Sequence, residues 1–167
     1  TNPQRHRDTE TTTGRARGSF LAVQEATGTL EDAARRNLLD DETRAFTAAR
    51  NLRPQFAPTL FELAATLILS GKFPEALEVS SQTVRLVPNS PRAHRQRAEI
   101  LHSLGARLAA IDELRVVCAL NPYDEFAAMQ LGDLYMETGQ HEKAIDAYRS
   151  GLDAGSRSVA ASPRNTE

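Results

Sequence analysis

The sequence has few of the residue types and patterns that mark disulfide-rich, membrane or nucleic-acid-binding proteins. Its only cysteine is Cys118, which excludes a disulfide within the chain. No apolar run is long enough to span a bilayer, and no secretory signal is visible. The formal net charge is -2, and only Lys72 and Lys143 are lysines. This charge gives no electrostatic support for binding nucleic acid or inserting into an anionic membrane.

Motifs that carry catalysis or bind metals are also missing. The chain has no phosphate-binding loop, no nucleophile elbow and no isolated pair of carboxylates. Its four histidines are scattered, without the helical spacing of metal ligands. Cys118 lies beside Val116, Val117 and Leu120, which favours a buried apolar role over a reactive thiol. We therefore expect no enzymatic activity, no metal and no cofactor.

What the sequence does have is a repeat of 34 residues. Three columns of small or ring-constrained residues recur at this step: Gly71, Gly105 and Gly139; Ala76, Ala110 and Ala144; and Pro54, Pro88 and Pro122. Agreement of three columns at one step defines both a repeating unit and its local structure. The chain is therefore predicted to be a tandem array.

Each unit is predicted to form two amphipathic helices. Apolar residues recur at steps of three and four from Leu60 to Leu67, and again from Ala76 to Val87. Gly71 can adopt the left-handed conformation that ends the first helix, and Pro74 suits the start of the second. Ser90-Pro91 is predicted to cap and open the next helix. Small residues at Ala64, Ala98 and Gly132 would let helices approach closely.

These features resemble those of tetratricopeptide repeat proteins. The unit with the closest match contains Leu131-Gly132, Tyr135, Gly139, Ala144 and Tyr148. The resemblance implies an all-α, right-handed α-α superhelix with clear repeats at 57–90, 91–124 and 125–158. Two features depart from the family pattern. The large aromatic expected near the start of each unit is replaced by Leu60, His94 or Ala128, and Ser156 stands where a closing proline is expected.

The two ends are predicted to be less regular. Residues 1–18 contain four arginines and five threonines and are predicted to be disordered, as are residues 159–167. Residues 19–56 are predicted to form imperfect helices of a degenerate repeat, with Thr27-Gly28-Thr29 as an interruption. The first residue is threonine rather than methionine, which suggests a fragment or a processed product.

The resemblance also implies a binding groove, because the first helix of each repeat lines the concave face in this family. The positions that correspond to the groove are Pro58, Phe61, Ala65, Ile68, Leu69, Arg92, Arg95, Glu99, His102, Ser103, Phe126, Met129, Asp133, Met136 and Glu137. From Leu60 to Leu69 the first helix is apolar on nearly every side, so something must cover its additional face.

Three interpretations of what covers this additional face of the helix remain open. The imperfect N-terminal helices could bury Phe61 and Ile68 against Phe20, Leu21 or Val23. Alternatively, an apolar helix or extended peptide of a partner could lie in the groove, anchored by Phe61, Ile68, Phe126 and Met129. Self-association is a third possibility.

Two further expectations concern charged side chains. The lysine, arginine and asparagine clamp with which some family members hold acidic C-termini has no counterpart here, so such a tail is not the expected ligand. Arg97 occupies a column that holds Leu63 and Leu131. It is expected to lie along apolar surface with its head in water or paired to an acid such as Asp112 or Glu113, and the alternative is a contact to another chain.

Together, these features predict an adaptor-like module for protein-protein interaction. The alternatives are a recruiting or regulatory domain of a larger enzyme and a homo-oligomeric structural scaffold. The partner and the compartment are left open, with an intracellular location favoured.

Overall fold

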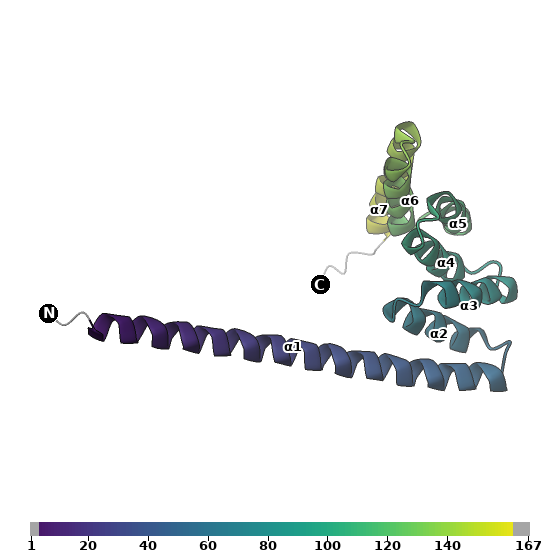
Figure 1. The fold of residues 1–167 in the computed structure, drawn as a ribbon. Coiled ribbons are helices and arrows are strands. Elements are labelled where there is room, and N and C mark those ends of the chain that lie inside the picture. The colour runs from purple at the N-terminus through teal and green to yellow at the C-terminus, as the bar shows by residue number, and fades with distance from the viewer. Residues whose placement is uncertain (1–3, 162–167) are drawn as a thin grey trace, which may run out of the picture. The chain divides into compact units, whose positions relative to one another are not determined.

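The computed structural model describes residues 4–161, and side-chain environments within residues 28–156. Over these residues the chain is helical, without strands (Figure 1). The helices are α1 (Gln4–Leu52), α2 (Ala57–Leu69), α3 (Phe73–Leu86), α4 (Pro91–Ser103), α5 (Arg107–Leu120), α6 (Glu125–Glu137) and α7 (His141–Ala161). The chain divides into two units after Asp41.

The first unit consists of the greater part of α1, and it corrects the prediction for the N-terminal end. One continuous helix begins at Gln4 and runs through Thr27-Gly28-Thr29, which contradicts the predicted disorder over 4–18 and the predicted interruption. Residues 1–3 of the predicted disordered segment lie outside the described residues. Proline is absent from Gln4 to Leu52, and a glycine inside a helix costs only about 1 kcal/mol relative to alanine. Composition alone therefore did not exclude a helix here. Leu30 and Leu38 are exposed on it.

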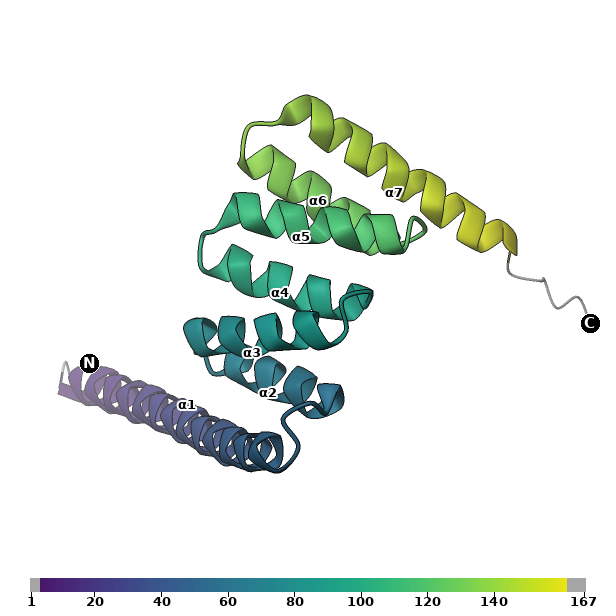
Figure 2. The ribbon, with the colours of Figure 1, turned by 90° about the vertical axis from the view of Figure 1, so that its right-hand side faces the viewer.

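The second unit is a stack of three antiparallel helix pairs, α2 with α3, α4 with α5, and α6 with α7 (Figure 2). Each pair turns at a glycine in the left-handed region: φ is 69° at Gly71, 76° at Gly105 and 73° at Gly139. L-residues rarely adopt this conformation, so the glycine column is explained by the backbone of the turn. The predicted repeats 57–90 and 91–124 each contain one of these pairs, and the predicted repeat 125–158 contains α6 and most of α7.

Side-chain caps fix the start of two first helices. The Ser90 hydroxyl accepts a hydrogen bond from the Ala93 amide at 3.4 Å, with Pro91 in the first turn, which confirms the predicted cap of α4. The Asp124 carboxylate caps α6 in the same way, accepting from the Ala127 amide at 3.0 Å. These caps satisfy amide groups that have no partner within the helix.

The core confirms the small-residue columns. Ala76, Ala110 and Ala144 are fully buried where the two helices of each repeat cross. At Gly132, an added β-carbon would lie 2.4 Å from the Tyr148 ring, so this column position in α6 can hold only glycine while the ring stays in place. Close helix packing thus depends on these residues.

The C-terminal helix is longer than its counterparts. It continues to Ala161, beyond residue 159, where the disordered tail was predicted to begin; residues 162–167 lie outside the described part. Ile145 and Leu152 are exposed on α7. Among the described helices, none has the length and apolar character needed to cross a membrane.

Candidate functional site: a cleft between α4 and α6

A cleft of about 190 Å³ opens between the first helices of the second and third repeats. We call it the α4–α6 cleft, and it is lined by Arg95, Ala98, Glu99, His102, Leu114, Gln130, Asp133, Leu134 and Glu137. Five of these, Arg95, Glu99, His102, Asp133 and Glu137, are among the predicted groove positions. They come together because residues at steps of three and four share one face of a helix.

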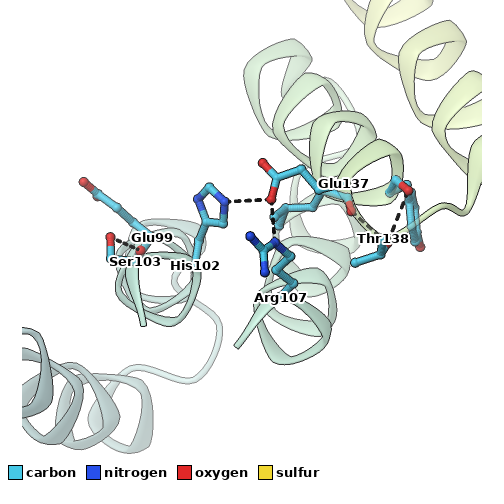
Figure 3. A network of polar contacts seen from close by, with 8 residues as sticks. Glu99, His102, Ser103, Arg107, Glu137 and Thr138 are labelled. Carbon is cyan, nitrogen blue, oxygen red and sulfur yellow. Dashed lines mark hydrogen bonds and ion pairs between the residues drawn. The ribbon is translucent and has the colours of Figure 1, made fainter. Parts of the chain in front are cut away.

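One edge of the cleft carries a charged network that links three helices. The Nε2 atom of His102 on α4 lies 3.1 Å from a carboxylate oxygen of Glu137 on α6. The Arg107 Nε atom, from the start of α5, donates to the same oxygen at 2.8 Å (Figure 3). The hydrogen bond from Arg107, followed by that from His102, lowers the pKa of Glu137. All three side chains are solvent-exposed, so the network can exchange partners with a ligand.

The other edge is held by Arg95. Its guanidinium pairs with Asp124 and lies 5.9 Å from the centre of the Phe126 ring. The Nε atom of Arg95 and the Oε1 atom of Gln130 are buried without a hydrogen-bond partner among the described residues. Such groups usually meet water or a ligand, because leaving them unpaired is costly.

Two carboxylates belong to the cleft without a cation opposite them. Glu99 is exposed and takes part in no ion pair within the described residues, and its side chain extends away from His102 in Figure 3. Asp133 accepts a hydrogen bond from the Tyr148 hydroxyl at 2.7 Å, which raises the pKa of Tyr148. In the sequence, Tyr148 is recognisable only as a residue at the repeat spacing of the family. Its role in positioning Asp133 could not be recognised from spacing alone.

Outside the cleft, the predicted groove residues differ in how accessible they are. On α6, Phe126 is 59% exposed and Met129 and Met136 are each 48% exposed. On α2, Leu69 is exposed, Ala65 and Ile68 are partly buried, and Phe61 is only 8% exposed. The exposed apolar side chains are thus concentrated on α6 and at the end of α2.

Phe61 is covered by an arginine of the next repeat. The Arg92 guanidinium lies 4.4 Å from the centre of its ring and pairs with Glu62 at 3.0 Å. Gln96 also donates a hydrogen bond to the Phe61 carbonyl at 3.0 Å. The polar residues of α4 therefore close over this part of α2.

On another side of α4, a buried histidine replaces the aromatic of the repeat. His94 is 8% exposed, and its Nε2 atom donates to the Pro88 carbonyl at 2.8 Å. Its Nδ1 atom lies 2.7 Å from Glu113, which also pairs with Arg97 at 3.2 Å. The predicted pairing of Arg97 with Glu113 is confirmed. These polar contacts explain how His94 is accommodated in a packing position.

The repeat, its glycine turns and its stacked helix pairs define a tetratricopeptide-type α-α solenoid, a class of protein-interaction scaffolds. The chain belongs to the family described as bacterial transcriptional activator domain, which matches residues 31–165.

The chain is also similar in sequence to parts of two other proteins. BBSome complex member BBS4 of Bos taurus is 29% identical over 136 residues, which are 77% of this chain and 23% of that protein. Small glutamine-rich tetratricopeptide repeat-containing protein 2 of Mycosarcoma maydis is 28% identical over 78 residues, covering 47% of this chain and 22% of that protein. The chain thus matches less than a quarter of the length of these relatives.

Among solved structures, one of MamA is 29% identical and has a TM-score of 0.66, covering 70% of this chain and 68% of that one. The fold found here is therefore that of a known helical-repeat protein over more than two thirds of the chain.

Proposed function

We propose that the chain binds a helical segment of a partner protein along α6 and across the α4–α6 cleft. The observation that carries this proposal is the apolar face of α6, where Phe126, Met129 and Met136 are all about half exposed or more. Apolar side chains gathered on one face of a soluble protein usually mark an interaction site. A helix laid in a groove is one of the established ways in which helical proteins recognise peptides.

The family supports a setting for this interaction. Its description refers to bacterial transcriptional activators. We propose that the module contacts another protein during transcriptional activation, as a recruiting or regulatory part of a larger protein. This setting favours regulation over enzymatic chemistry.

Capture of partners by full-chain protein, followed by mass spectrometry, tests the proposal. The Met129→Glu variant should lose the partner while keeping the helical content and melting transition of the original protein, because its side chain is half exposed. Leu108→Glu is the matched control, since Leu108 is 67% exposed on α5 and does not line the cleft. Equal capture by Met129→Glu and the original protein would refute the proposal.

A further inference from the structure

We propose that the α4–α6 cleft receives a basic side chain, lysine or arginine, from an amphipathic helix of the partner. This inference rests on the proposed function and names the chemistry of the occupant. Its first support is size. The cleft of about 190 Å³ is smaller than the roughly 300–1,000 Å³ of typical small-molecule sites. This volume suits a single side chain presented by a larger ligand.

The charges around the cleft define what that side chain must be. The cationic groups are already paired with acids: Arg95 pairs with Asp124, which leaves only its buried Nε–H without an acceptor among the described residues, and Arg107 pairs with Glu137. His102 is bound to the same Glu137 carboxylate. Glu99 and Asp133 form no ion pair with any residue that the structure describes, so the charge left for a ligand is negative.

A hydrogen-bond acceptor reinforces this selection. Gln130 lines the cleft, and its buried Oε1 atom has no donor among the residues that the structure describes. A lysine ammonium offers three donors and an arginine guanidinium offers five, whereas a carboxylate offers none. A basic side chain can therefore satisfy Gln130 and neutralise Asp133 or Glu99, and an acidic one can do neither.

The apolar residues of α6 define the rest of the occupant. Phe126, Met129 and Met136 lie on one face of α6, and the ten residue steps from the first to the last span about 15 Å at 1.5 Å per residue. A partner helix of about three turns would cover this length. Methionine side chains adapt to different apolar surfaces, so the stripe places few demands on the shape of the partner. Asp133 lies within this stripe, which places the basic residue among the apolar anchors.

The test uses two synthetic amphipathic helical peptides with the same leucine stripe. One carries lysines on its polar face and the other carries glutamates. Their affinities for the full chain are measured by calorimetry at two salt concentrations. The lysine peptide should bind more tightly than the glutamate peptide by at least about tenfold, and more weakly at high salt, because screening reduces charge attraction. Equal affinities, or no binding by the lysine peptide, would overturn the inference.

Two double variants test whether the preference for the lysine peptide arises in the α4–α6 cleft. Glu99→Gln with Asp133→Asn should weaken binding of the lysine peptide about fivefold or more, by the usual size of partly exposed charge pairs. Asp112→Asn with Asp146→Asn removes the same charge from exposed ion pairs on α5 and α7 and should leave affinity unchanged. Equal loss in both double variants would show a general charge effect and overturn the cleft assignment.

A third peptide tests an occupant from this chain itself. Residues 14–26 contain Arg15 and Arg17 beside Phe20, Leu21 and Val23. Binding of this peptide that is tighter than that of the lysine peptide would overturn the assignment to a partner and indicate a segment of a second copy.

The inference and the proposed function fail in different ways. Suppose that Met129→Glu abolishes partner capture but the Glu99 and Asp133 double variant does not weaken capture. The proposed function is then supported, and the proposed preference for a basic side chain is refuted.

Discussion

Equivalent positions of the first and third repeats differ sharply in accessibility. Phe61 and Met129 occupy the same column of the 34-residue repeat, yet Phe61 is 8% exposed and Met129 is 48% exposed. Arg92 of the following repeat lies over Phe61, whereas no further repeat follows α7 in the described part of the chain. Accessibility of a groove position thus depends on the neighbouring repeat as well as on its own side chain.

The largest expected effect comes from reversing polarity at the covered position. Phe61→Glu should lower the free energy of unfolding by roughly 4 kcal/mol, because it removes a buried ring that packs beneath Arg92. Met129→Glu at the equivalent exposed position should change stability by less than about 0.5 kcal/mol. Urea unfolding of both variants measures the difference. Equal destabilisation would mean that the two positions are alike in solution.

Substitutions at two glycines should show a similar contrast between a tightly packed position and an unpacked one. Gly132→Leu should destabilise the third repeat by about 3 kcal/mol, because its β-carbon would meet the Tyr148 ring, which a hydrogen bond to Asp133 holds in place. Gly28→Ala is the control: nothing lies within 4 Å of the new methyl group. Thermal melting should show a loss for the first variant and none for the second. An unchanged melt for Gly132→Leu would contradict the packing of α6 on α7.

A smaller effect is expected from the polar cluster of the second repeat. Glu113→Ala should cost about 1–2 kcal/mol, since it leaves partly buried His94 and Arg97 without their carboxylate. Asp112→Ala on the exposed face of the same helix should cost less than about 0.5 kcal/mol. Chemical unfolding that fails to separate these variants would show that the cluster does not stabilise the repeat.

The smallest effect concerns the pKa of Glu137, which the hydrogen bonds from Arg107 and His102 lower. Arg107→Gln should raise this pKa toward its ordinary value, and by more than His102→Gln does, because the Arg107 bond has the larger effect. The contribution of these Glu137 contacts to folding stability is fully present above the pKa of Glu137 in the unfolded state. It is lost as pH falls through the lower pKa of Glu137 in the folded state. Carboxyl NMR titration of the three proteins measures the shifts. No change in either variant would show that the network does not persist in solution.

The repeat could be predicted from sequence because its determinants are local. The positive φ at Gly71, Gly105 and Gly139 and the cap at Ser90 depend on residues close in the chain. The continuity of α1 could not be read from composition, because polar residues oppose burial without preventing helix formation.

The candidate site could be predicted only in part, for a different physical reason. The resemblance to tetratricopeptide repeats implied that Arg95, Glu99 and Asp133 face the groove, and all three line the cleft. The stacking of Arg92 on Phe61 depends on how adjacent repeats rotate, and no pattern within one repeat specifies that rotation. The resemblance therefore indicated the face but not which of its residues are free to bind.

Site-specific photo-crosslinking from position 129 tests the central claim most directly. A photoreactive phenylalanine analogue placed at Met129 should form a covalent adduct with the partner protein, because this side chain is exposed on the apolar face of α6. The same analogue at Leu108, an exposed position outside the cleft, should form none. An adduct from position 108 without one from position 129 would contradict the assignment of the binding face to α6.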